Sequence, residues 1–582
     1  MRKRMFITLL AGFAVSVLLT LVGYASDLNI CGPDLNRSSW VYYDDNGKLQ
    51  YKSLNTYGDK IMDFSTAGYK QGTVAIPTAP PIITLSPSCA EPCPCGDDTK
   101  QIQNAIDELS RKEPLNSDGL RGAVRLAPGC YTVTGTLTID TSGVVLQGSG
   151  VSADRGTVIY FGQSYHDKGL PNNVPFVMLG TSNDPKLSKS KINITDDYVP
   201  AGTLTLTLGV SNAAGLEGKH VMITKPVTPE WVNLMKMDDS GCPGGDPCWI
   251  PYFSDWLQTD RNIVAVQGNQ VTLDAPMSDS IDSTYSPLPY LQTYSFPERI
   301  SQVGVENLRV IAPQPPPCLE PDKDHVYQLV VTHSVIDAWA RNLTAQDTLQ
   351  SVDIGNYSKQ VTVSNVAITH TVDQKGDAKF EEFWIAGATQ VLMEHVEDTA
   401  LNTFFFSTST ATQGPNVLRY GKFYGDASVE PHQRWATGLL VEDTTVERRS
   451  GPNPPTKKCT GRVPSQEVAA IDFWNRGAWG TGHGWTIGWG VVWNSKAEEF
   501  YIQKPPGSEN WCIGCLGEQK KSQPPPFNFP TFPIEPQAIE PQGVIDSPNT
   551  CISPLSLYLA QLCERVPEAP ECTGATEGEP MP

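Results

Sequence analysis

The feature that most constrains the fold of this chain is a loose repeat of short β-rich runs joined at small or polar corner residues. The corners are Asn307, Asn342, Asn365, His395, Gly421, Asp443 and Asn494. Most successive corners lie about 22 to 35 residues apart, and the longer last step fits two turns with a further corner near Asn475. A unit of this length cannot bury its apolar face alone and must stack on its neighbours. The repeat therefore predicts a solenoid.

The spacing of the β runs identifies the kind of solenoid. Residues 121–150 hold three β-rich runs broken only by "APGC" and "TSG", so no crossover helix fits between them. A β-sandwich or a propeller also uses many short strands, but a propeller would show more even spacing. We predict a single-stranded parallel β-helix domain over residues 99–517, with stacked rungs from about 120 to 515. Residues 97–112 carry apolar residues at helical spacing, with Asp98 or Thr99 as N-cap, and predict a helix that caps the N-terminal end.

The two ends of the chain differ from the repeat. Residues 1–25 have a basic start, an apolar run and small residues before the expected cut, which predicts a cleaved signal peptide; an uncleaved anchor is the alternative. Residues 26–98 are a lead-in and cap. Residues 518–582 are predicted to form a proline-rich strap without regular structure to about 548, a short helix and an acidic tail. The helix, near 553–566, is expected to dock through Leu555, Leu557, Leu559 and Leu562.

The cysteine content and the net charge indicate the cellular compartment of the protein and limit its possible binding partners. Fourteen cysteines behind a signal peptide predict a secreted, extracellular or periplasmic protein with disulfides, among them Cys242–Cys248. Cys512 and Cys515 lack a second metal-finger pair and are expected to form a structural disulfide. A net charge of −20 argues against nucleic acid, and mildly against a polyanionic glycan unless cations gather locally. We expect a monomer without a membrane partner after signal cleavage. No cofactor or metal is expected, although the acidic residues leave calcium open.

Several segments resemble a known superfamily. "GDDTKQIQNAID", followed by "GAVRLAPGCYTVTGTLTI" and "GVVLQGSG", resembles the entry to the pectate-lyase superfamily. "DFSTAGYKQGTVAIP", "PHQRWATG", "GTGHGW" and "PPGSENWCIGC" resemble a secreted branch of largely uncharacterised polysaccharide-active proteins. The resemblance implies a right-handed parallel β-helix with an N-terminal capping helix, and a polysaccharide as partner. It names no substrate, because the superfamily includes lyases, glycoside hydrolases and non-catalytic glycan-binding solenoids.

Two segments hold the candidate catalytic residues. His432 and Arg434 alternate along an extended run and can share a face, and His483 lies between glycines where a side chain can stand exposed. If turns stack in register, these residues and Arg476 meet in one groove, because two rungs span only about 10 Å. Trp435 and Trp485 are predicted to form a sugar-stacking wall. The alternative is that each histidine only hydrogen-bonds a turn, that the arginines snorkel or pair with Asp, and that tryptophans such as Trp489 and Trp493 are core.

These residue types suit β-elimination from a uronate. An arginine can neutralise the substrate carboxylate through a bidentate fork, and a histidine can remove the C5 proton near neutral pH. Lys379 and Glu382 are candidate substrate-binding residues. Glycoside hydrolysis needs paired carboxylates, for which Asp377, Glu381, Glu382 and Asp472 are available, although those near Lys379 are interpreted as a solvated rim. A lyase is the main hypothesis, and a hydrolase and a non-catalytic binder remain as alternatives.

Overall fold

The computed structural model describes residues 30–32, 35–88, 94–112, 114–162, 172–238, 249, 256–316, 326–372, 381–400, 404–425, 428–448, 469–477, 482–521 and 540–573. Several predictions fall outside these residues. They are the signal peptide, the Cys242–Cys248 pair, Lys379, Asp377, residues 522–539 of the proline-rich strap and the acidic tail from residue 574.

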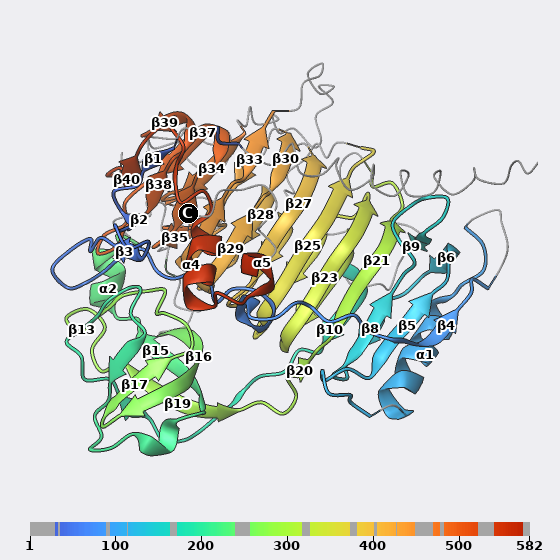
Figure 1. Ribbon diagram of the computed structural model, residues 1–582, viewed down its shortest axis with the longest axis horizontal. Coiled ribbons are helices and arrows are strands. Elements are labelled where there is room, and N and C mark those ends of the chain that lie inside the picture. The colour runs from blue at the N-terminus through green and yellow to red at the C-terminus, as the bar shows by residue number, and fades with distance from the viewer. Residues whose placement is uncertain are drawn as a thin grey trace, which may run out of the picture.

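The body of the molecule is one large parallel sheet wound into a solenoid with three sides (Figure 1). Side 1 contains β4 (Pro81–Leu85), β5 (Gly122–Leu126), β8 (Val144–Gln147), the first halves of β21 (Gly304–Ile311), β23 (Val335–Gln346), β25 (Lys359–Thr369) and β27 (Leu392–Ala400), and then β29 (Gln413–Arg419), β32 (Ala436–Glu442), β35 (Ile487–Gly488), β36 (Val491–Trp493), β38 (Trp511–Ile513) and β40 (Val544–Asp546). Side 2 contains β6 (Gly129–Val133), β9 (Thr157–Phe161), the second halves of β21 to β27, β30 (Lys422–Gly425), β33 (Thr445–Glu447) and the start of β37 (Lys496–Ile502).

Side 3 carries the candidate site. It contains β7 (Leu137–Ile139), β10 (Asn173–Gly180), β22 (Val326–His333), β24 (Val352–Ile354), β26 (Glu381–Ile385), β28 (Phe404–Thr408), β31 (Ser428–Val429), β34 (Ala470–Phe473), the end of β37 and β39 (Leu516–Lys520). Each strand pairs in parallel with its counterpart one rung away. This pairing confirms the parallel β-helix that the repeat and the resemblance predict.

The corners between sides 1 and 2 lie at or next to the predicted residues. Asn307, Asn342 and Asn365 have φ values of 61°, 53° and 54°. Asparagine tolerates this left-handed region better than most residues. Asn342 donates to Asn307 over 3.0 Å and Asn365 donates to Asn342 over 3.2 Å, so the amides form a ladder along the solenoid. At the predicted Gly421 corner, Tyr420 takes the left-handed conformation instead.

The predicted corner near Asn475 is wrong. Strand β32 pairs directly with β36, and β33 pairs with β37, so Asp443 and Asn494 belong to adjacent rungs. One turn therefore spans the whole step between them. Its additional residues lie between β33 and β34 and between β34 and β35, and residues 449–468 and 478–481 are outside the described part of the chain.

Helix α1 (Thr99–Lys112) closes the N-terminal end of the solenoid, as predicted (Figure 1). Its apolar face, which includes Ile102, Ile106 and Leu109, is buried in the same core as the inward residues of β5 and β8. Asp98 precedes the helix, and its carbonyl accepts the amide of Ile102 over 3.0 Å.

An antiparallel lobe interrupts the solenoid between β10 and β20 (Ile300–Ser301), contrary to the prediction of continuous rungs from 120 to 515. It contains β11 (Lys186–Leu187), β12 (Ile192–Asn193), β13 (Tyr198–Val199), β14 (Thr205–Thr207), η2 (Ala214–Leu216), β15 (His220–Pro226), α2 (Pro229–Leu234), β16 (Trp256–Gln267), β17 (Gln270–Leu273), β18 (Ile281–Asp282) and β19 (Tyr290–Ser295). The lobe has its own small apolar core and lies beside the solenoid (Figure 1).

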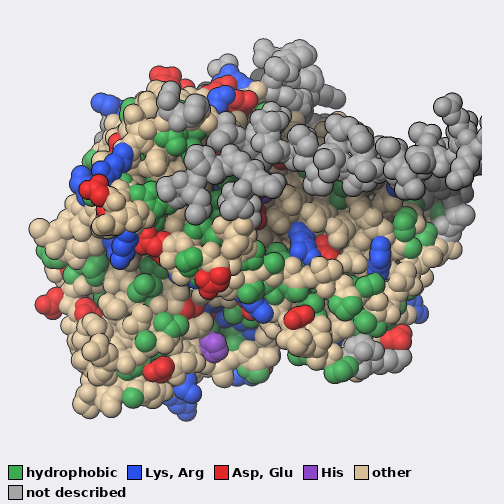
Figure 2. Space-filling model, viewed as in Figure 1, with side chains coloured by type: hydrophobic (Ala, Val, Ile, Leu, Met, Phe, Trp, Pro, Cys, Tyr) green, Lys and Arg blue, Asp and Glu red, His purple; other side chains and the backbone are tan. Residues whose placement is uncertain are grey.

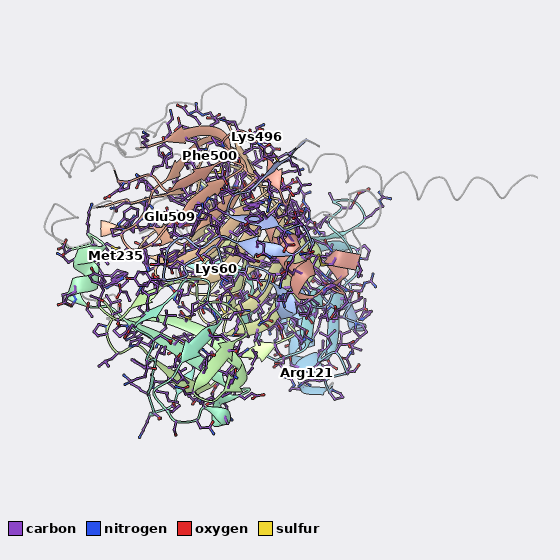
Figure 3. The ribbon with its side chains drawn as sticks, turned by 60° about the vertical axis from the view of Figure 1, so that its left-hand side comes forward. Lys60, Arg121, Met235, Lys496, Phe500 and Glu509 are labelled. Atoms are coloured by element: carbon purple, nitrogen blue, oxygen red, sulfur yellow. A yellow bond between two sulfur atoms is a disulfide. The ribbon has the colours of Figure 1, made fainter. Side chains whose placement is uncertain are left out.

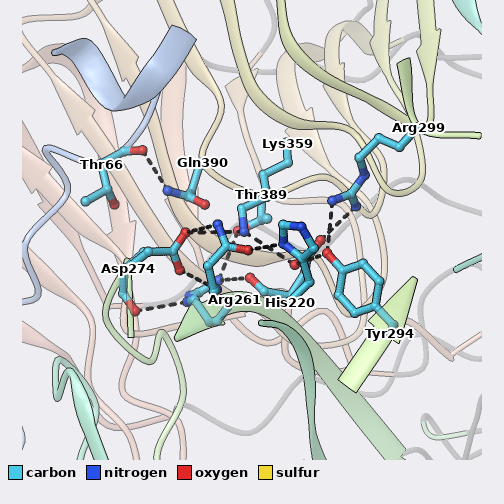
Figure 4. A network of polar contacts seen from close by, with 12 residues as sticks. Thr66, His220, Arg261, Asp274, Tyr294, Arg299, Lys359, Thr389 and Gln390 are labelled. Atoms are coloured by element: carbon cyan, nitrogen blue, oxygen red, sulfur yellow. Dashed lines mark hydrogen bonds and ion pairs between the residues drawn. The ribbon is translucent and has the colours of Figure 1, made fainter. Parts of the chain in front are cut away.

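A buried polar network joins the lobe to side 1 of the solenoid (Figure 4). Asp260 of the lobe pairs with Arg299 over 2.7 Å and with Lys359 of β25 over 3.4 Å. Arg261 donates to the carbonyl of Gly414 over 2.6 Å. Burial opposes ionisation of Asp260, but Lys359 and Arg299 outweigh it and hold the pKa of this carboxyl below its usual range. The network therefore fixes the lobe to the solenoid through charge as well as packing.

The N-terminal and C-terminal segments of the described chain come together on the outside of side 1. The N-terminal part holds β1 (Asn36–Arg37), β2 (Val41–Tyr43), β3 (Leu49–Tyr51) and η1 (Tyr69–Gly72), and the C-terminal part holds β41 (Ile552–Ser553), α4 (Leu557–Arg565) and α5 (Pro570–Thr573). They share an apolar cluster with Trp489, Trp493 and Trp511. Leu557 and Leu562 of α4 are fully buried and Leu555 and Leu559 are half-buried, which confirms the docking prediction.

Other predictions for the C-terminal part are partly wrong. Residues 516–520 and 544–546 form β39 and β40, so the segment from 518 to 548 is not free of regular structure. Cys512 and Cys515 form the expected disulfide, and Cys31–Cys551 and Cys563–Cys572 close the terminal segments. Among the described residues, no helix is long and apolar enough to cross a bilayer.

Candidate functional site

A polar cluster on side 3, formed by Glu381, Glu430, His432, Arg476 and His483, contains three of the four predicted catalytic residues. Nδ1 of His432 lies 2.9 Å from Oε1 of Glu381. The rings of His432 and His483 meet edge to face, with centroids 4.8 Å apart. Nη1 of Arg476 donates to the carbonyl oxygen of His432 over 2.9 Å. The sequence thus predicted the convergence of His432, Arg476 and His483, and Arg434 lies two residues after His432.

Strand register brings these residues together. Glu381 is opposite Phe404 on the next rung, and Phe404 is opposite Ser428 on the one after. The ring of Phe404 stacks near that of His432, at 6.1 Å, and the Arg476 guanidinium lies 5.7 Å from its centre. The Phe404 ring therefore packs against both His432 and Arg476, on the rung between Glu381 and the turn after β31.

The turns after β31 and β34 hold the two histidine segments against each other. The amide of Arg434 donates to the carbonyl of His483 over 3.0 Å, and the amide of Arg476 donates to that of Gly484 over 2.8 Å. Arg434 and Trp435 have φ values of 47° and 63°, and Gly484 has 59°. These left-handed residues turn the chain sharply enough for His432 and His483 to meet.

The two histidines differ in exposure and charge. The His432 side chain keeps 23% of its surface exposed, whereas His483 is buried. Burial, together with Arg476, His432 and Arg434, lowers the pKa of His483 far below that of a free histidine. His483 is therefore neutral at physiological pH, and His432 is the member of the pair that a ligand can reach.

Neither predicted arginine presents an exposed, unpaired guanidinium to a substrate carboxylate. Arg434 is fully buried, and its Nη1 donates to Gln433 over 2.6 Å. Arg476 is buried with Nε 3.4 Å from Oε1 of Glu430, an oxygen that also accepts from Trp474 over 2.9 Å. A substrate carboxylate would have to compete with Glu430 for Arg476.

The predicted sugar-stacking wall of Trp435 and Trp485 is wrong. Both rings are buried against α2 of the lobe, where Trp435 meets Trp231 at 5.8 Å. Nε1 of Trp435 donates to Asp279 over 2.9 Å, and Nε1 of Trp485 donates to the carbonyl of Met235, which Figure 3 labels where the lobe meets the solenoid. These tryptophans hold the lobe in place. Trp489 and Trp493 are buried, as expected, beneath the terminal segments.

The solvated rim predicted near Lys379 is also wrong for its described members, because Glu381 and Glu382 are both buried. Glu382 accepts from Ser351 over 2.7 Å and lies 3.9 Å from His370, which in turn lies 3.2 Å from Asp398. Glu382 therefore belongs to a buried cluster, and nothing places it at the surface to bind substrate. Both glutamates were named from the sequence but interpreted as surface residues, whereas they begin the buried strand β26.

A further carboxyl on side 3, Asp353 of β24, was not predicted. Burial and the nearby Glu381 raise its pKa to about 7.

Among the described residues, no group of three His, Cys, Asp or Glu side chains is arranged to hold a metal ion. On the face seen in Figure 2, basic and acidic side chains are interspersed, without one large basic patch.

No protein-family model matches the chain, and no curated protein matches it in sequence. It is similar in structure to the tailspike protein gp49 from Pseudomonas phage LKA1, with 12% identity, a TM-score of 0.32, and 72% of this chain and 69% of that chain covered. It is also similar to a hyperthermoactive exopolygalacturonase from Thermotoga maritima, with 10% identity, a TM-score of 0.28, and 76% of this chain and 77% of that chain covered. A third similar structure is PfbA, a surface adhesin of Streptococcus pneumoniae, with 10% identity, a TM-score of 0.28, and 74% of this chain and 77% of that chain covered. At TM-scores of this size, the fold assignment depends on the strand pairing of the chain itself.

Proposed function

We propose that this chain is a secreted enzyme that cleaves a uronate-containing polysaccharide by β-elimination, with His432 as the base. The observation that carries the proposal is the contact between Nδ1 of His432 and Glu381, on a histidine that stays partly exposed. The negative charge of Glu381 beside Nδ1 favours the tautomer that carries its proton on Nδ1 and leaves Nε2 as the acceptor; the contact is a close approach of charge, not an aligned hydrogen bond. Nε2 is then the atom that can take a proton from a substrate.

The proposed reaction needs few groups. Nε2 of His432 takes the proton from C5 of the uronate, the electron pair of that C–H bond forms the C4–C5 double bond, and the C4–O4 bond breaks. The imidazolium returns its proton to O4 of the departing sugar. Glu381 stabilises the imidazolium while it exists, and the neutral His483 adds no opposing charge. The products are an unsaturated uronate and a new chain end.

Arg476 is the cation beside His432 that can attract the uronate carboxylate. Its contact with Glu430 is long, at 3.4 Å, and its Nη1 is bonded to the His432 carbonyl. We expect the substrate carboxylate to share the guanidinium with Glu430. A charge-assisted pair of this kind would place C5 of the uronate near His432.

Secretion is part of the proposal. It is supported by the signal-like residues 1–25 and by disulfides Cys31–Cys551 and Cys563–Cys572, which persist in oxidising compartments.

The test is incubation of the purified full chain with a panel of uronate-containing and neutral glycans. Both the ultraviolet absorbance of unsaturated uronates and the appearance of reducing ends are followed. We expect both signals on a uronate polymer, and expect His432→Ala to abolish them with little change in melting temperature. The matched control is His220→Ala, which removes an exposed lobe histidine. Glycan binding without product from the wild-type chain would overturn the proposal in favour of a binding protein.

Hydrolysis is the second candidate, because Asp353 favours it. A carboxyl with a pKa of about 7 near Glu381, which is paired with His432, resembles the acid and base of a glycosidase. In that case reducing ends would appear without the ultraviolet signal. Asp353→Asn and Glu381→Gln would each abolish them.

A further inference from the structure

Three side chains form a row across three successive rungs of side 3: Asp353 of β24, Trp384 of β26 and Ser407 of β28. The strand register pairs Asp353 with Trp384 and Trp384 with Ser407. Their neighbours Val352, Phe383 and Phe406 lie in the solenoid core. Because side chains alternate along a strand, the row points outward.

Each member of the row has a buried polar atom without a hydrogen-bond partner: Oδ1 of Asp353, Nε1 of Trp384 and Oγ of Ser407. Buried polar groups in folded proteins are nearly always hydrogen-bonded, so three such atoms in one row need an explanation. Together they offer an acceptor, a donor and a hydroxyl that can act as either. Ser407 is fully buried and the unpartnered atoms of all three residues are buried, but Asp353 and Trp384 are only partly buried as whole residues, so a ligand on side 3 would meet these two side chains first.

The row leads directly to the polar cluster. On the rung after Ser407, the amide of Glu430 donates to the carbonyl of Phe406 over 3.0 Å. The carboxylate of Glu430 contacts Arg476, which holds the His432 carbonyl. A chain-like ligand that lies along side 3 would therefore pass from the row to His432.

We infer that Asp353, Trp384 and Ser407 form a subsite for a neutral, hydroxyl-bearing sugar ring, adjacent to the position of the uronate. The inference rests on the proposed function for the position of cleavage. It narrows the substrate class to polysaccharides in which a neutral sugar adjoins a uronate.

The chemistry of the row favours a neutral ring. The Trp384 indole offers an apolar face to a sugar ring and its N–H to a ring or hydroxyl oxygen. Asp353 accepts from a hydroxyl, whereas a carboxylate on the sugar would meet it with like charge. No lysine or arginine of the described residues forms an ion pair with Asp353. Burial and Glu381 already raise the pKa of Asp353 to about 7, so a further negative charge is unfavourable there.

Binding is measured by calorimetry at pH 7 with short neutral hexose oligosaccharides, and separately with homopolymeric uronate oligosaccharides. We expect the wild-type chain to bind a neutral oligosaccharide and Trp384→Ala to weaken binding at least about tenfold. Trp384→Phe keeps the ring and removes the N–H, and Ser407→Ala removes one hydroxyl, so each should weaken binding about threefold to tenfold without loss of the fold. The matched control, Trp256→Ala, changes an exposed lobe tryptophan and should leave binding unchanged.

The result that overturns the subsite is an equal affinity of wild type, Trp384→Phe and Trp384→Ala for neutral oligosaccharides, or no binding of them by wild type. The proposed function fails separately. If Trp384-dependent binding occurs and no glycan is cleaved, the subsite stands and the enzymatic proposal falls. If a homopolymeric uronate is cleaved equally by wild type and Trp384→Ala, the enzymatic proposal stands and the subsite falls.

Discussion

His432 reaches back across two rungs of side 3, so that its Nδ1 lies 2.9 Å from Oε1 of Glu381. The pair joins the start of β26 to the turn after β31. A carboxylate at this position can stabilise the imidazolium that forms when the other ring nitrogen takes a proton.

Glu381→Gln tests this relationship. The amide keeps the size of the side chain and a hydrogen-bond acceptor but removes the charge. We expect turnover to fall about 100-fold, which is the size of effect that the loss of general acid–base catalysis produces. The melting temperature should change little. The measurement is kcat/KM as a function of pH on the best substrate of the panel. Unchanged kcat/KM at every pH would show that Glu381 has no part in the chemistry.

The asparagine corners Asn307, Asn342 and Asn365, whose side-chain amides form a ladder, were predicted from the sequence. They give a second testable prediction. The left-handed φ of 53° at Asn342 is accessible to asparagine and glycine but costly for a β-branched residue. Asn342→Val should therefore lose about 2 kcal/mol of unfolding free energy, the sum of backbone strain and lost ladder hydrogen bonds.

Asn342→Gly separates the two contributions. Glycine adopts the same backbone without strain and loses only the hydrogen bonds to Asn307 and Asn365. Urea unfolding should find it clearly more stable than Asn342→Val. Equal losses would mean that the corner conformation carries no cost.

The solenoid was predictable because its corners need residues that tolerate unusual backbone, and these recur visibly in the sequence. The lobe was not, because its antiparallel strands have the same length and composition as solenoid strands. Only the pairing partners distinguish them, and sequence periodicity does not contain that information. The insertion also explains why the prediction for Trp435 and Trp485 was wrong, since α2, which buries them, lies some 200 residues earlier in the chain.

The candidate site was predictable only in part. Stacking of turns was enough to expect His432, Arg476 and His483 together, because residues at equivalent turns become neighbours. Their partners Glu381 and Glu430 are fixed by register, which a loose repeat does not define to within one residue. The pairing of Arg476 with Glu430 was missed for this reason, and the roles of these residues in catalysis remain predictions.

Asp260→Asn tests the junction between lobe and solenoid. The substitution leaves Arg299 and Lys359 buried beside a neutral group, although Asp274 still lies 3.4 Å from Lys359. Breaking a buried ion network typically costs about 3 to 5 kcal/mol. We expect a loss of this order in urea unfolding and faster proteolytic release of the lobe. The control is Arg155→Ala, which removes an exposed ion pair with Asp154 and should change neither.

The buried cluster of His370, Glu382 and Asp398 predicts a loss of stability at alkaline pH. Burial opposes the charged form of His370, but Asp398, Glu382 and Asp347 outweigh it and raise its pKa to about 9. Burial raises the pKa of Glu382 to about 8. A histidine with a raised pKa in the folded state stabilises the protein fully below about pH 6.5, and this stability is lost as pH rises through about 9. Glu382 also makes the unfolding free energy fall as pH rises, because its ionisation costs more free energy in the folded state than in the unfolded chain.

The measurement is the free energy of unfolding in urea from pH 6 to pH 9, below the range in which most lysines and tyrosines titrate. The wild-type chain should lose a few kcal/mol across this interval. Glu382→Gln cannot ionise, so its stability should fall less steeply with pH while its acceptor can still bond Ser351. Glu217→Gln, a change of an exposed carboxylate on the lobe, should leave the wild-type slope intact. A flat wild-type profile, or the same slope in Glu382→Gln, would show that these buried groups do not change protonation on unfolding.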